Sequence, residues 1–111
     1  MSLFDRELVK GSTSLLVLQL LSTGDMYGYQ IVKEMKKRSE NALEVKEGTL
    51  YPGLHKLEHK GFIESYWKEQ VKGPARRYYR ITAEGQELLE SKTKEWNLFV
   101  KMINQVLGTS K

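Results

Sequence analysis

The chain has 111 residues, enough for one domain built around a single hydrophobic core. Hydrophobic residues make up 40% of it and charged residues 29%, a balance that excludes an intrinsically disordered chain. The net charge of +4 is only mildly basic, so the positions of the basic residues matter more than their number. The sequence contains no cysteine, which excludes disulfides, thiolate catalysis and cysteine-ligated zinc.

The N-terminal segment does not resemble a signal peptide. MSLFDRELVKGS contains acidic residues and lacks an apolar run beside a cleavage site. The longest apolar stretch, residues 15–18, is far too short to cross a bilayer. We therefore expect a cytoplasmic protein with no membrane partner.

The first predicted helix covers residues 5–22, and its second half is apolar on almost all sides. Such a helix is buried on more than one side. A domain this small has difficulty covering it alone, so the pattern indicates a partner chain. Gly24 is a suitable C′ residue to end this helix, and Asp25 is a suitable N-cap for the next one.

The second predicted helix covers residues 26–39. Tyr27, Ile31 and Met35 repeat every four residues, as expected for the face that packs on the core. The C-terminal half is basic, and we interpret its cations as a solvated face placed favourably at a helix C-terminus. A polar connection follows at residues 40–46.

The third predicted helix begins near residue 47 or 49 and ends before Gly61. Its leucine stripe, at positions 50, 54 and 57, is assigned to the core. Pro52 is expected in the first turn, where the N–H groups have no intrahelical partner. The opposite face has no acidic residue and has small residues near its N-terminus, so it can approach base edges and phosphates. The candidate DNA contacts on this helix are Thr49, Tyr51, Pro52, His55 and Lys56.

Two strands are predicted next, at residues 62–69 and 76–81, joined by a basic Gly-Pro loop. From Val71 to Thr82 there are four basic residues and no acidic one, the sharpest charge asymmetry in the chain. We expect this hairpin to place its loop on phosphates or in a minor groove. The candidate contacts are Lys72, Gly73, Arg76 and Arg77. The aromatic residues Tyr66, Trp67, Tyr78 and Tyr79 are interpreted as hairpin packing.

The last predicted helix is capped by Thr82, runs to about Leu107 and ends at Gly108, a length of roughly 37 Å. A 4-3-4-3-4 spacing, which is typical of a coiled-coil-like seam, joins Leu89, Thr93, Trp96, Val100, Ile103 and Leu107. The far end of the helix has no remaining segment of the chain to pack on, so we predict a dimer contact. The predicted interface residues are Leu89, Trp96, Val100, Ile103 and Leu107.

The element order is therefore helix, helix, helix, strand, strand, helix. It predicts a mostly α fold with a small β-hairpin: a winged helix-turn-helix followed by a long C-terminal dimerisation helix. We expect the DNA-binding part at residues 1–81 and the dimerisation helix at residues 82–111, joined in one compact unit.

The segments EGTLYPGLHKLEHKGFIESYW and GPARRYYRITAEG resemble the PadR family of bacterial transcriptional regulators, and so does the upstream MYGYQIVKEM. The resemblance covers about residues 8–90. It implies a homodimeric repressor that occupies a pseudo-palindromic operator in double-stranded DNA. It also implies release by a small aromatic or amphiphilic effector, as in multidrug-sensing members, where a Trp of the last helix stacks on planar ligands. Trp96 matches that position.

Several features of the sequence argue against enzyme activity and metal binding. The chain has no Gly-rich phosphate loop and no nucleophile elbow, so we expect no enzyme activity. His55 and His59 stand at i, i+4 without a clear third ligand, so neither a metal nor another cofactor is expected. Two alternatives remain: a regulator of the same fold without a small-molecule effector, and a winged helix used for protein interaction. The basic loop favours DNA over the second.

Overall fold

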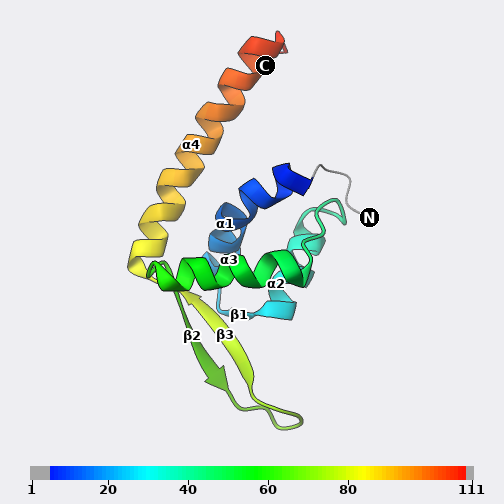
Figure 1. Ribbon diagram of the computed structural model, residues 1–111, viewed down its shortest axis with the longest axis vertical. Helices are drawn as coiled ribbons and strands as arrows, with labels where there is room; N and C mark the ends of the chain where they lie inside the picture. Colours follow the sequence, from blue (N-terminus) through cyan, green and yellow to red (C-terminus); the bar gives the residue numbers. More distant parts are fainter. Residues whose placement is uncertain (1–5, 110–111) are drawn as a thin grey trace.

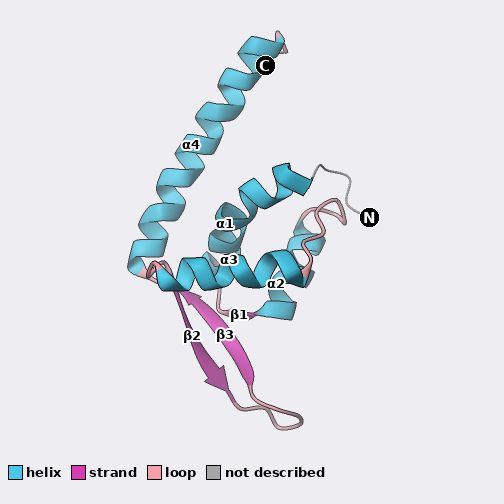
Figure 2. Cartoon of the chain, viewed as in Figure 1, coloured by secondary structure: helices cyan, strands magenta, loops and turns pink. Residues whose placement is uncertain are grey.

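The computed structural model describes residues 6–109, and it confirms the predicted order of helices and strands (Figure 1). It adds one two-residue strand, β1. The elements are α1 (Arg6–Ser22), β1 (Met26–Tyr27), α2 (Gly28–Arg38), α3 (Glu47–His59), β2 (Ile63–Lys68), β3 (Arg76–Ile81) and α4 (Ala83–Leu107). Figure 2 shows the β2–β3 hairpin extending from the helical body on the side away from the end of α4.

The additional strand corrects the prediction that a helix begins at residue 26. Met26 and Tyr27 pair with Tyr79 and Tyr78 of β3, giving an antiparallel sheet in the order β1-β3-β2. Met26 is 6% exposed, so its side chain is in the core while its backbone is used by the sheet. The helix therefore begins two residues later than predicted, at Gly28.

The predicted N-cap of α2 is also wrong. Tyr27 holds the N-cap position and makes no side-chain cap hydrogen bond. Asp25 instead accepts a hydrogen bond of 2.6 Å from the Tyr66 hydroxyl and one of 3.4 Å from Arg80 Nε. The strand at residues 26–27 separates Asp25 from the start of the helix, so its carboxylate anchors the connection to the outer side of the hairpin.

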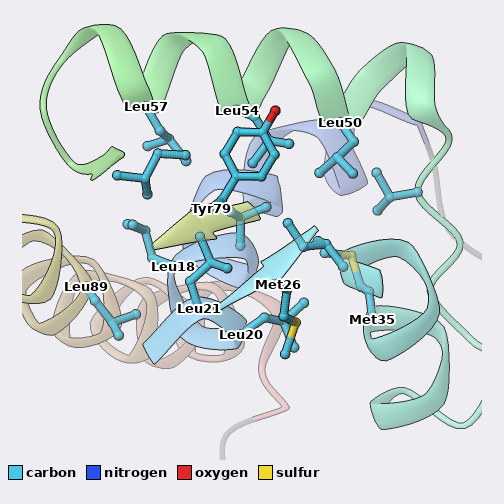
Figure 3. Packing of buried hydrophobic residues seen from close by; sticks show 14 residues of the cluster. Leu18, Leu20, Leu21, Met26, Met35, Leu50, Leu54, Leu57, Tyr79 and Leu89 are labelled. Carbon is cyan, nitrogen blue, oxygen red and sulfur yellow. The ribbon is translucent and has the colours of Figure 1, made fainter. Parts of the chain in front are cut away.

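The leucine stripe of α3 is buried, as predicted. Leu50, Leu54 and Leu57 are 0%, 1% and 5% exposed. Figure 3 shows them pointing from α3 towards Leu18 of α1 and Tyr79 of β3. Burying a leucine side chain contributes about 1.5–3 kcal/mol, so this stripe is a main attachment of α3 to the body.

The prediction that Pro52 lies in the first turn of α3 is wrong. The helix begins at Glu47, and Pro52 is inside it. The N–H groups of Thr49 and Leu50 already bond the carbonyl of Lys46, at 3.0 and 2.9 Å. Pro52 has no N–H to offer the carbonyl of Gly48, four residues earlier. The proline therefore removes one helical hydrogen bond close to the exposed start of α3.

The predicted cap of α4 is confirmed. Thr82 Oγ1 accepts a hydrogen bond of 3.1 Å from the N–H of Gly85 and donates one of 2.7 Å to the carbonyl of Gly61. Gly108 ends the helix in a left-handed conformation with φ of 75°. Between these caps α4 rises away from the body, and the principal extent of the molecule is 55 Å (Figure 1). Over residues 6–109, no helix combines the length and apolar character needed to cross a membrane.

Candidate nucleic-acid interface

The outer face of α3 is exposed along the side opposite its leucine stripe. Pro52, His55 and Lys56 are exposed, Tyr51 is 38% exposed, and Thr49 is half-buried. Tyr51 also fixes the helix against α2, because a side chain at Gly28 would overlap its hydroxyl group. The predicted α3 contacts therefore lie on one surface, and Tyr51 contributes to both the surface and the packing of α2 on α3.

The loop of the hairpin forms a second basic surface. Lys72, Gly73 and Arg76 are exposed in it or at its edge, and Gly73 has a φ of 89°, which favours glycine. Gln70 Nε2 donates a hydrogen bond of 2.5 Å to the carbonyl of Pro74 and so closes the loop. The basic loop is therefore an ordered turn at the end of the hairpin farthest from the C-terminus (Figure 2).

The outer face of the sheet carries a row of tyrosines. Tyr78 stands between Tyr66, at 5.8 Å between ring centroids, and Tyr27, at 5.4 Å. Each ring has a cation over it: Arg76 lies 4.4 Å from Tyr27, Lys68 5.1 Å from Tyr78, and Arg80 4.8 Å from Tyr66. Cation–π contacts of this kind stabilise a half-exposed sheet face by about 0.5–1 kcal/mol each.

The tyrosines pack within the hairpin as predicted, but Trp67 does not. Tyr79 is 6% exposed and lies in the core, whereas Trp67 is 69% exposed near the end of β2. The strand continues past the helical body at this point, so no core surface reaches the indole. The guanidinium of Arg77 lies over the indole ring, at 6.0 Å from its centroid.

Arg76 and Arg77 point to opposite faces of β3, because successive side chains of a strand alternate. Arg76 lies over Tyr27 on the outer face. Arg77 lies on the α3 side, where its Nε donates to Ser65 Oγ at 3.0 Å and its Nη2 to Glu58 Oε1 at 3.2 Å. The sequence placed both arginines together as loop cations, whereas the structure gives them different partners.

Asp25 and its partners shift the ionisation of the outer face. The hydrogen bond that Tyr66 donates to Asp25 raises the pKa of the Tyr66 phenol, and partial burial adds to it. The negative charge of Asp25 raises the pKa of Arg80, which remains protonated. Burial raises the pKa of Tyr79 in the core. Tyr66 and Tyr79 are therefore both neutral at physiological pH, and Tyr66 donates its hydroxyl proton to Asp25.

The predicted seam of α4 divides into two parts. Leu89 is 8% exposed and belongs to the core of the single chain, whereas Trp96, Val100 and Ile103 are 40%, 38% and 41% exposed. Leu107 is 67% exposed. The apolar side chains from Trp96 onwards are exposed, because α4 extends beyond the end of α1 (Figure 1).

Trp96 also forms one wall of an apolar groove between α1, α4 and the segment after α2. The groove has a volume of about 340 Å³. Its lining residues are Leu8, Ser12, Leu15, Leu16, Ser39, Ala42, Leu43 and Trp96. Within residues 6–109, no group of three or more His, Cys, Asp or Glu side chains is arranged to hold a metal ion.

The fold and sequence match known transcriptional regulators. A transcriptional regulator from Clostridium thermocellum is 37% identical, with a TM-score of 0.85 over 93% of this chain and 97% of that one. A PadR family transcription regulator from Clostridium difficile is 39% identical, with a TM-score of 0.77 over 87% and 99%. A transcriptional regulator from Mycobacterium tuberculosis is 32% identical over 93% of this chain and 90% of that protein.

The family match agrees with the resemblance seen in the sequence motifs. Residues 17–91 match the family model described as the transcriptional regulator PadR-like family. Members of this family are transcriptional regulators and not enzymes. The chain therefore belongs to the PadR-like family of transcriptional regulators.

Proposed function

We propose that this regulator is a homodimeric repressor that binds a pseudo-palindromic operator and is released by a small aromatic or amphiphilic molecule. The observation that carries the proposal is the pairing of two surfaces. The exposed face of α3 has no acidic residue between Gly48 and Leu57, and the adjoining hairpin ends in a basic loop. A helix and a basic hairpin side by side suit a major groove and the neighbouring phosphates.

In this proposal α3 enters the major groove. Lys56 reaches a guanine or a phosphate, His55 reaches the same groove, and the Tyr51 and Thr49 hydroxyls bond phosphates at its edge. Lys72 and Arg76 bind the backbone from the hairpin loop, and Gly73 allows the loop to approach closely. In this arrangement the loop contributes affinity for DNA of any sequence, and the face of α3 discriminates between sequences.

The dimer is proposed on the exposed part of α4. Val100, Ile103 and Leu107 continue the stripe that Leu89 begins in the core. A contiguous apolar stripe exposed to water marks a site of association with another protein surface. A second copy of the chain offers the same stripe in return. A two-fold dimer places two α3 helices about 34 Å apart, so the operator is expected to contain paired half-sites.

The effector site is proposed at the groove beside Trp96. Its volume of about 340 Å³ is in the range of small-molecule sites, and its lining is mostly apolar. The Trp96 and Phe99 rings lie 6.3 Å apart and offer planar surfaces to an aromatic ligand. Because the chain has two tryptophans, Trp67→Phe leaves Trp96 as the sole reporter. Quenching of its fluorescence by a planar cationic dye is expected, and its absence would exclude this effector class.

DNA binding is tested by mobility-shift titration at several salt concentrations. Arg76→Ala is expected to weaken binding to all sequences alike and to reduce the salt slope by about 0.9, the change for one phosphate contact. Lys56→Ala is expected to weaken specific sites more than random DNA, by about 1–3 kcal/mol if it bonds a base. Lys101→Ala, an exposed charge on α4, is the matched control. If neither variant differs from this control, the groove assignment is wrong.

A further inference from the structure

Three side chains form a closed network between α3 and the hairpin. Arg77 of β3 donates from Nη2 to Glu58 Oε1 of α3 at 3.2 Å and from Nε to Ser65 Oγ of β2 at 3.0 Å. Ser65 Oγ in turn donates to Glu58 Oε2 at 2.5 Å. The side chains of Arg77 and Glu58 are 38% and 29% exposed. We call these three residues the helix–wing clamp.

Glu58 is an acidic residue on a helix whose exposed face is proposed to approach the negatively charged DNA backbone. It is the only acidic residue of α3 after Glu47, and it stands on the helix proposed to approach DNA. A free carboxylate there would repel phosphates. Both of its oxygens are instead engaged by the clamp, and the guanidinium of Arg77 balances its charge. The positive charge of Arg77 is therefore already paired with Glu58 and is less available to bind a phosphate.

Beyond the clamp, the outer face of the hairpin is held by the Tyr66–Asp25 hydrogen bond and by Arg76 over Tyr27, but the sheet itself is narrow there. β1 pairs with β3 only at Tyr78 and Tyr79, so the rest of the hairpin is a two-stranded ribbon. An isolated two-stranded hairpin is marginally stable in water. The clamp bonds one residue from each strand to α3, at the point where the ribbon leaves the body.

We infer that Arg77 is a positioning residue and not a phosphate contact: with Glu58 and Ser65 it fixes the angle between α3 and the basic loop. This inference rests on the proposed DNA binding. Fixing the angle sets the one spacing at which α3 and the loop reach DNA together. Specific binding depends on that spacing, whereas random DNA can be held by either surface alone.

Glu58→Ala shows whether Glu58 merely repels DNA or holds the clamp, because the two cases change DNA affinity in opposite directions. If Glu58 were a bystander, loss of its negative charge would strengthen DNA binding. With the clamp it is expected to weaken specific binding about three- to tenfold, as for one half-exposed charge pair, and to leave random-DNA affinity within about twofold. Glu64→Ala makes the same charge change on the outer face, where Glu64 pairs with Arg80 at 3.5 Å, and is the matched control.

Arg77→Lys and Arg77→Ala complete the comparison. Lysine keeps the charge but cannot bond Ser65 and Glu58 through a planar fork, so it is expected to lose specific affinity as Glu58→Ala does. Arg77→Ala is expected to leave the salt slope unchanged. A phosphate contact predicts the reverse: lysine substitutes for arginine, and alanine reduces the slope by about 0.9. That reverse pattern would overturn the inference.

A measurement without DNA keeps the inference separate from the proposed function. Trp67 faces Arg77 across the strand pair, and in a Trp96→Phe background it is the sole tryptophan. Glu58→Ala leaves Arg77 in place, so an increase in Trp67 mobility, measured by fluorescence anisotropy decay, reports a loosened hairpin. Unchanged mobility would overturn the clamp. If the parent protein bound no DNA, the proposed function would fail, while Trp67 would still decide whether the clamp fixes the hairpin.

Discussion

The helices α3 and α4 both carry an apolar stripe, but only one of the two stripes is covered by the chain itself. In α3, the three leucines of the stripe are at most 5% exposed. In α4, the apolar residues from Trp96 to Leu107 are 38–86% exposed. The pattern of a helix therefore predicts which face will be buried, while the surface that covers it can belong to the same chain or to another.

The difference follows from where each helix lies. α3 crosses the body, with α1, α2 and the sheet beneath it. α4 packs at its start, where Gly85 and Leu89 are buried, and then passes beyond α1. An apolar surface left in water in this way is a site for association.

Among the substitutions in the two stripes, Leu54→Ala is expected to lower the stability of the folded chain most. Leu54 is 1% exposed beneath α3, and removing its side chain loses the transfer free energy and leaves a cavity. The free energy of unfolding is expected to fall by about 2–5 kcal/mol. Chemical denaturation monitored by circular dichroism measures it. A loss below about 1 kcal/mol would show that α3 is not attached through this stripe.

Gly85→Ala tests the junction at which α4 leaves the hairpin. A methyl group at Gly85 would overlap the carbonyl oxygen of Phe62, which is backbone and cannot move aside easily. We expect a loss of about 1–3 kcal/mol, after the helix-favouring effect of alanine. Gly11→Ala in α1, where nothing lies within 4 Å, is the control and is expected to stabilise slightly. Equal effects of the two substitutions would contradict the close contact.

Ile103→Ala is expected to change the unfolding free energy of the single chain least, by about 0.5 kcal/mol or less, because Ile103 is 41% exposed. Its effect should appear instead in self-association, measured by sedimentation equilibrium over a range of concentrations. The dissociation constant of the dimer is expected to rise about tenfold or more, equivalent to 1.4 kcal/mol. An unchanged constant would place the dimer contact elsewhere.

Much of the fold follows from local patterns. The leucine spacing of α3, the Thr82 cap and the end of α4 at Gly108 are set by residues within a few positions of one another, and all three predictions are confirmed. The basic loop could also be predicted locally, because its basic residues are close together in the sequence. Such features depend on helix period, capping chemistry and composition, which neighbouring residues determine.

Two of the errors depend on how distant parts of the chain are arranged. Asp25 looked like a helix cap, but its carboxylate bonds Tyr66 and Arg80, 41 and 55 residues away. Trp67 looked like hairpin packing, yet the ribbon carries it past the core and leaves it 69% exposed. In neither case does the neighbouring sequence contain the group that decides the outcome.

The helices, the hairpin, the capped start of α4 and the family can be predicted from the sequence, because they depend on local periodicity and local chemistry. The contacts that the side chains make depend on how distant segments pack. Arg76 and Arg77 are adjacent and identical, but strand alternation sends one over Tyr27 and the other to Glu58. Likewise, packing buries Leu89 within the chain and leaves Ile103 exposed on the same stripe, because the body ends between them.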